Sequence, residues 1–138
     1  MLLKNVMTPQ VEDISPDESI RDAASKMKSL DIGALAVMDE GRVVGMITDR
    51  DIAIRAVARG RGPDTPVRSA MTPKVVYCHE EDDIDTAAMV MREEQIRRLL
   101  VVDLDGKPVG IVSLGDLATR THDEYLCGRV LECVSESM

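Results

Sequence analysis

Tryptophan and phenylalanine are absent from this chain of 138 residues, and Tyr77 and Tyr125 are its only tyrosines. Without aromatic side chains the protein lacks the stacking platforms that bind single-stranded nucleic acid. A formal net charge of −8 argues further against a surface for nucleic acid or anionic membrane. The apolar core must therefore consist of Val, Ile, Leu, Ala and Met.

Long apolar runs are lacking as well. No stretch of about 18 consecutive apolar residues occurs, so the sequence predicts no membrane-spanning helix. The N-terminal residues Met1 to Val6 are too few and too polar for a signal peptide. These observations predict a cytoplasmic protein that binds neither nucleic acid nor a membrane.

Cysteine and histidine are scarce. Cys78, Cys127 and Cys133 show no CxxC spacing, which favours free thiols. A metal site joining Cys78, His79 and a tail cysteine is the alternative. Because the chain has two histidines and no visible set of nucleophile, base and orienting group, the sequence predicts neither a resident metal nor an enzyme.

The chain repeats itself. Val6-Met7-Thr8-Pro9 returns as Ala70-Met71-Thr72-Pro73, 64 positions later (71 − 7). Past the turn after Asp39 the offset becomes 65, so the segment from Gly45 to Asp51 matches that from Gly110 to Asp116. A one-residue slip inside a turn is typical of two diverged copies of one folded unit. The repeat predicts two halves, residues 1–62 and 63–121, that share one core, followed by a C-terminal helical tail, residues 122–138.

Each half is predicted to run strand–helix–strand–strand–helix. In the first half, Ser15 and Glu18 fit a capping box at the start of a helix that ends near Asp31. Apolar runs on both sides of Glu40-Gly41 predict a hairpin. The remaining predicted elements of this half are a strand at 11–14 and a helix at 49–59, with Ile52, Ala56 and Val57 facing inward. The tail is predicted to form a helix that Gly128 interrupts or ends.

Four features of this pattern resemble the CBS domain: the Met-Thr-Pro opening, the Ala-Ala helix, the apolar strand that ends in Asp39 or Asp103 and the Gly-apolar-apolar-Ser/Thr-x-x-Asp ending. They occur in the same order in both halves, over about residues 3–121. The resemblance implies a stand-alone tandem pair, or Bateman module. Its mixed α+β fold would pack two repeats about a pseudo-two-fold axis, with an extra C-terminal helix.

The two Ser/Thr-x-x-Asp segments are the main candidates for chemistry. A carboxylate can accept hydrogen bonds from both vicinal hydroxyls of a ribose. The resemblance implies this role for Asp51 and Asp116, with Thr48 and Ser113 orienting the ligand. The alternative is that both segments are only helix N-caps with an acidic third residue.

Adenine and phosphate contacts also follow from the resemblance, which places each cleft between the repeats. The adenine-binding residues would be Ile32, Ile96, Met46 and Ile111, and their alternative role is core packing. Arg98, Thr8 and Thr72 would bind phosphate. For Arg98 the alternative is a solvated strand edge, and the two threonines could instead initiate turns before proline. One cleft would combine Thr8, Ile32, Ile111, Ser113 and Asp116; the other would combine Thr72, Ile96, Met46, Thr48 and Asp51.

The resulting hypothesis is a non-catalytic sensor that binds AMP, ADP, ATP or S-adenosylmethionine and signals to an unidentified regulated protein by changing conformation. No cofactor is required, since the nucleotide is a regulatory ligand. The alternative is a ligand-free interaction module. A homodimer through the module helices is expected, with apolar Ala24, Met27 and Val57, and the tail residues Leu126, Val130, Leu131 and Val134, as candidate contacts. The tail could instead fold back on its own module.

Overall fold

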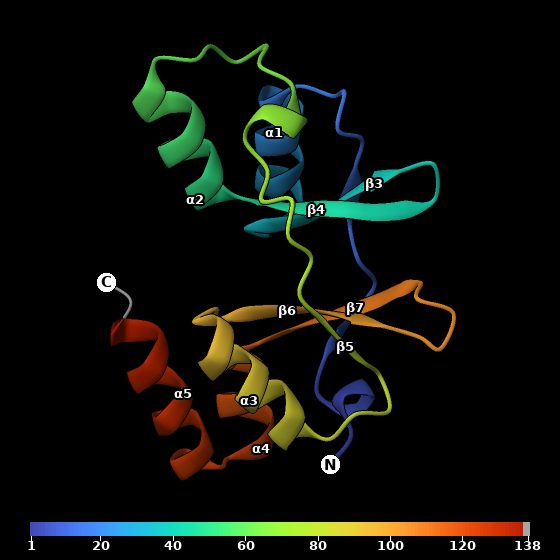
Figure 1. Ribbon diagram of the computed structural model, residues 1–138, viewed down its shortest axis with the longest axis vertical. Coiled ribbons are helices and arrows are strands. Elements are labelled where there is room, and N and C mark those ends of the chain that lie inside the picture. Colours follow the sequence, from blue (N-terminus) through green and yellow to red (C-terminus); the bar gives the residue numbers. More distant parts are fainter. Residues whose placement is uncertain (137–138) are drawn as a thin grey trace. The chain divides into compact units, whose positions relative to one another are not determined.

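The computed structural model describes residues 1–136 and divides into two compact units (Figure 1). The contiguous unit is the single stretch Glu12–Val75. The composite unit joins Met1–Val11 to the chain from Val76 onward. Each unit has its own sheet, helices and apolar core. The predicted mixed α+β class is confirmed, whereas the pseudo-two-fold axis stays a prediction.

The contiguous unit contains a three-stranded sheet in the order β2-β3-β4. β2 (Asp13–Ile14) is parallel to β3 (Ala34–Asp39), which forms the predicted hairpin with β4 (Arg42–Thr48). The hairpin turns at Glu40 and Gly41, which both have positive φ. Helix α1 (Ile20–Leu30) packs against the sheet through Ile20, Ala23 and Met27, whereas Ala24, which the same i, i+3, i+4, i+7 spacing includes, is exposed.

Helix α1 begins later than the sequence suggested. Ser19, not Ser15, is the N-cap, because its hydroxyl accepts the backbone N–H of Asp22 at 3.1 Å. Ser15 and Glu18 instead close a turn that precedes the helix. The N–H of Ile20 donates to the carbonyl of Thr65, which fixes the first helical residue from outside the helix. The predicted cap was therefore wrong by one turn.

The helical stretch after β4 is not a regular α-helix. It consists of α2 (Asp49–Asp51), a π-helical segment η2 (Ile52–Ala56) and a 3₁₀ segment η3 (Val57–Arg59). Ala56 is fully buried, as predicted. Val57 was predicted to face inward as well, but it is 67% exposed, because the wide π turn shifts the residues that follow it.

The composite unit has a four-stranded sheet in the order β1-β7-β6-β5. β6 (Arg98–Val102) and β7 (Pro108–Ser113) form an antiparallel hairpin, β5 (Tyr77–His79) is parallel to β6, and β1 (Thr8–Pro9) is antiparallel to β7. Helices α3 (Ile84–Glu94), α4 (Leu114–Thr121) and α5 (Glu124–Glu136) lie on one side of this sheet (Figure 1).

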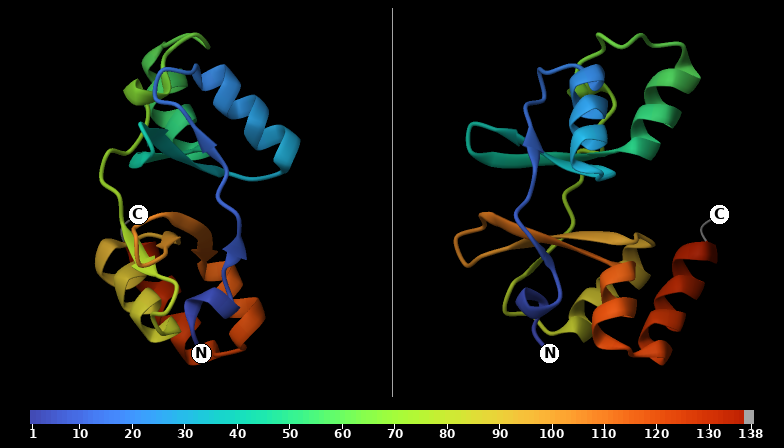
Figure 2. Two further views of the ribbon diagram at one scale, coloured as in Figure 1. Left: turned by 90° about the vertical axis from the view of Figure 1, so that its right-hand side faces the viewer. Right: turned by 180° about the vertical axis from the view of Figure 1, so that it is seen from behind.

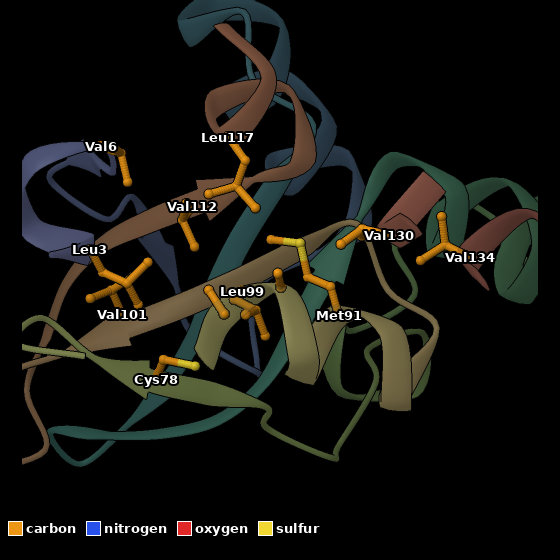
Figure 3. Packing of buried hydrophobic residues seen from close by; sticks show 12 residues of the cluster. Leu3, Val6, Cys78, Met91, Leu99, Val101, Val112, Leu117, Val130 and Val134 are labelled. Carbon is orange, nitrogen blue, oxygen red and sulfur yellow. The ribbon is translucent and has the colours of Figure 1, made fainter. Parts of the chain in front are cut away.

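Helix α5 packs on α3 and α4 of its own unit. Val130 and Val134 are buried in the composite core together with Met91 and Leu117 (Figure 3). Gly128 neither interrupts nor ends the helix, contrary to the prediction, because this packing outweighs the roughly 1 kcal/mol that a helical glycine costs. No helix within residues 1–136 is long and apolar enough to cross a membrane.

The two structural units do not coincide with the two halves of the sequence, because each half contributes a short segment to the unit formed mainly by the other half. The first segment contains the 3₁₀ turn η1 (Leu3–Asn5) and β1, and it belongs to the first half of the sequence. It nevertheless completes the composite unit (Figure 2). Leu3 and Val6 are buried there (Figure 3). The corresponding turn η4 (Val67–Ser69) completes the contiguous unit, where Val67 and Ala70 are buried. Each unit therefore takes its opening segment from the other half of the sequence.

Candidate functional site

Both Ser/Thr-x-x-Asp segments form complete capping boxes. Thr48 Oγ1 accepts the N–H of Asp51 at 3.1 Å, and Asp51 Oδ2 accepts the N–H of Thr48 at 3.0 Å. Ser113 and Asp116 repeat this arrangement at the start of α4, with both distances at 3.0 Å. The capping role is therefore real. It uses only one oxygen of each carboxylate.

The other carboxylate oxygen, Oδ1, takes no part in the cap. The side chains of Asp51 and Asp116 are 14% and 17% exposed, so solvent reaches them only in part. In the contiguous unit Thr72 Oγ1 donates to Asp51 Oδ1 at 3.5 Å. A partly exposed carboxylate whose second oxygen lies outside the cap can accept hydrogen bonds from a hydroxylated ligand.

Gly45 and Gly110, which begin the repeated Gly-to-Asp segments, allow a second piece of backbone to lie close against the strand. We call these two pieces, Met71–Pro73 and Met7–Pro9, the crossing segments. Thr72 exchanges two backbone hydrogen bonds with Met46, at 2.8 and 3.0 Å. A Cβ on Gly45 would lie 2.6 Å from the carbonyl oxygen of Thr72. A Cβ on Gly110 would likewise lie 2.8 Å from the carbonyl oxygen of Thr8. At each of these glycines the close approach is therefore made by another segment of the chain itself.

An arginine joins each carboxylate to the crossing segment. Arg55 Nε lies 3.7 Å from Asp51 Oδ1, while its Nη1 donates to the carbonyl of Met71 at 3.1 Å. Arg120, the counterpart of Arg55 in the composite unit, was not predicted as a site residue from the sequence. The signal was present, since both arginines follow their aspartate by four residues and match at the offset of 65.

Arg120 makes the same link in the composite unit. Its Nε lies 3.9 Å from Asp116 Oδ1, and its Nη1 donates to the carbonyls of Val6 and Met7 at 3.0 and 2.9 Å. Each unit therefore carries one half-site made of a capped aspartate, an arginine and a Met-Thr-Pro segment. We call them the contiguous half-site (Thr48, Asp51, Arg55, Thr72) and the composite half-site (Thr8, Ser113, Asp116, Arg120).

The other predicted site residues lie around these half-sites. Met46 and Ile111 pair with the crossing segments, opposite Thr72 and Thr8. Ile32 and Ile96 each pack against the core of their own unit, and their place in a cleft between the repeats stays a prediction. Arg98 begins β6 directly opposite Ser113, where the contiguous unit has Ala34 opposite Thr48. The two half-sites are therefore chemically different.

The cysteines contribute little to these sites. Burial raises the pKa of the Cys78 thiol to about 11, so this residue stays protonated near neutral pH and is a poor nucleophile or metal ligand. Burial also raises the pKa of Cys127. Within the part of the chain that the structure describes, no three His, Cys, Asp or Glu side chains are grouped as a metal site would need.

Two similar units with matching half-sites define a tandem-repeat architecture, and comparison with known proteins supplies the family. The CBS domain model matches residues 3–57 and 67–123, so the chain belongs to the CBS-domain family. It is 41% identical over 133 residues to the CBS domain-containing protein YhcV of Bacillus subtilis, covering 96% of this chain and 94% of that protein.

Two solved structures of similar fold contain adenosine compounds. The CBS domain pair of protein MJ0100, in complex with 5′-methylthioadenosine and S-adenosyl-L-methionine, matches with a TM-score of 0.80 and 30% identity over 88% of this chain and 96% of that one. CBSX2 in complex with AMP matches with a TM-score of 0.74 and 25% identity over 88% of this chain and 96% of that one.

Proposed function

We propose that this protein is a non-catalytic regulatory module that binds adenosine-type ligands. Asp51 and Asp116 would accept the ribose hydroxyls, with Thr48 and Ser113 orienting the ligand. The observation that carries the proposal is that each cap uses only Oδ2 of a partly exposed aspartate and leaves Oδ1 outside the cap, in both units. The adenosine compounds in two similar structures support the ligand class.

The remaining contacts follow the same assignment. Ile32, Ile96, Met46 and Ile111 would enclose the adenine. Arg98 would bind phosphate in the composite half-site, together with Thr8, while Thr72 would do so in the contiguous half-site. A guanidinium suits phosphate because its planar fork can hold two oxygens. The position of Arg98 opposite Ser113 supports this role, and Ala34 at the matching position predicts a preference for uncharged adenosines in the contiguous half-site.

Thermal melts against AMP, ADP, ATP, S-adenosylmethionine and adenosine test this function. A ligand at 100 times its dissociation constant adds about 2.7 kcal/mol to the folded state. For a domain of this size the melting temperature should rise by roughly 5–15 °C. The Arg98→Ala substitution should weaken the binding of AMP more than the binding of adenosine, because it removes only a phosphate contact.

Variants at the two aspartates separate binding from capping. Asp116→Asn keeps an oxygen that can accept the N–H of Ser113, so stability without ligand should change little. The loss of charge-assisted hydrogen bonds to ribose should weaken binding by about 10–100-fold. Asp116→Ala should also remove about 1 kcal/mol of helix-start stabilisation. A wild-type melt that none of the five compounds shifts at millimolar concentration would contradict the proposal.

A ligand-free interaction module is the second candidate. The completeness of both capping boxes favours it, because capping alone accounts for the Ser/Thr-x-x-Asp spacing. If Asp51→Ala and Asp116→Ala both lower the melting temperature while no adenosine compound raises it, this function replaces the first.

We also propose that the protein forms homodimers through the helices of the contiguous unit. Leu30, Ile54 and Val57 are 44%, 51% and 67% exposed there. Ala24 is exposed, whereas its counterpart Ala88 in the composite unit is buried beside α5. Met27 is buried and takes no part. A second copy of the protein would cover the exposed apolar residues of the contiguous unit, as α5 covers Ala88 on α3 in the composite unit.

Light scattering tests the dimer. The wild-type protein should have twice the monomer mass of 15.1 kDa at micromolar concentration, and Ile54→Glu combined with Val57→Glu should restore the monomer mass. Leu104→Glu is the control, since Leu104 is also apolar and is 87% exposed but belongs to the composite unit, in the turn between β6 and β7. A wild-type mass near 15.1 kDa throughout would rule out the dimer.

A further inference from the structure

The crossing segments are attached to their sheets by few backbone hydrogen bonds. β1 has two residues, and the segment around Thr72 is a single bridge to Met46. Strands this short are only marginally stable by themselves. The side chains that hold these segments in place therefore have a large share in fixing where Thr8 and Thr72 lie.

Arg55 and Arg120 are the side chains placed to do this. Their Nη1 atoms donate at 2.9 to 3.1 Å to carbonyls of the residues just before Thr72 and Thr8. Their Nε atoms lie 3.7 and 3.9 Å from Oδ1 of the aspartates, which is an ion pair and not a direct hydrogen bond. Each guanidinium thus has its shorter contacts with the segment and a longer one with the carboxylate.

The carboxylate oxygen in this ion pair is also the proposed ribose acceptor. A ribose that donates to Oδ1 competes with Arg Nε for the same oxygen or draws the guanidinium closer. In either case the arginine carries the change to the carbonyls of Met71, or of Val6 and Met7. A lysine could not do this equally well, because it lacks the planar fork that reaches two acceptors in fixed directions.

We propose that Arg55 and Arg120 are positioning residues that couple occupancy of each aspartate to the placement of the crossing segment. Each segment continues directly into the other unit, since Pro9 leads to β2 and Thr72 leads to β5. The arginines therefore provide a route from a ligand to the connections between the units. The ligand part of this inference rests on the proposed function; the positioning part does not.

Amide hydrogen exchange tests the positioning part without any ligand. The N–H of Thr72, which donates to Met46, should exchange about tenfold faster in Arg55→Met, the effect expected from losing one hydrogen bond that holds the segment. Arg55→Lys should restore this protection only in part. Arg59→Met is the matched control, because Arg59 is exposed four residues further along the same helical stretch. Unchanged Thr72 exchange in Arg55→Met would overturn the inference.

AMP and S-adenosylmethionine then test the coupling. Either compound, if it binds the wild-type protein, should slow exchange at Thr72, and Arg55→Met should remove this slowing and weaken binding by about tenfold. The Arg120→Met substitution should leave amide exchange at Thr72 unchanged, so it serves as the control for Arg55→Met. If none of the five adenosine compounds binds wild-type protein, the proposed function fails while the ligand-free exchange still decides the positioning role. If a compound binds and slows Thr72 equally in Arg55→Met, the arginine is merely structural and the coupling is wrong.

Discussion

A fragment of residues 12–75 is expected to fold cooperatively, whereas a fragment of residues 1–62 is not. The two fragments are nearly equal in length, and each contains α1 and the β3–β4 hairpin. The first includes Val67 and Ala70, which are fully buried in the contiguous core. The second replaces them with Leu3 and Val6, which belong to the composite core.

The expected difference is large relative to the stability of so small a domain. Burying one valine side chain contributes about 1.5–3 kcal/mol, and domains of about 60 residues have little stability to spare. Residues 1–62 also lack Thr65 and Val67, which form backbone hydrogen bonds with Ile20 and Glu18. Circular dichroism melts would compare the fragments, with Val67→Asp in residues 12–75 as the control that should unfold. Equal melting temperatures for both fragments would show that the exchanged segments do not matter.

Alanine at Gly45 or Gly110 is expected to destabilise the protein by about 1–3 kcal/mol or more. The added Cβ would meet a backbone carbonyl oxygen at 2.6 or 2.8 Å, and a backbone atom cannot rotate away as the end of a side chain can. The crossing segment would have to leave the strand. Thr72 or Thr8 would then be displaced from its half-site, so ligand binding there should fall together with stability.

Urea unfolding of matched variants would measure this effect. Gly62→Ala controls for Gly45→Ala in the contiguous unit, because no atom lies within 4 Å of the added Cβ, and it should change stability by no more than about 0.5 kcal/mol. Gly115→Ala controls for Gly110→Ala and should stabilise helix α4 slightly. If the motif variants unfold like their controls, the crossing segments are not packed as the structure has them.

Local patterns predicted most of the secondary structure. The helix that ends near Asp31 and the hairpin turn at Glu40-Gly41 depend on neighbouring residues, so the sequence contains them. The N-cap of α1 was misplaced because Ser15-x-x-Glu18 and Ser19-x-x-Asp22 both fit a cap. A hydrogen bond from Ile20 to the distant Thr65 selects the second.

The pairing of segments with units could not be predicted in the same way. The repeat shows that Val6–Pro9 and Ala70–Pro73 are equivalent, but equivalence does not say which core each segment completes. Thr48, Asp51, Ser113 and Asp116 were found because they recur within one short motif. Arg120 was missed because its partners, Val6 and Met7, are more than a hundred positions away in the sequence (120 − 7).

The exchanged N-terminal segment has a consequence during synthesis. The contiguous unit is complete once residue 75 has emerged from the ribosome, so it can fold at once. β1 must wait for β7, since Thr8 pairs with Ile111, 103 positions later (111 − 8). At typical elongation rates that delay is roughly 5–20 seconds. During this time Leu3 and Val6 have no core to enter, so the nascent chain offers chaperones its first apolar residues long before its last helix is made.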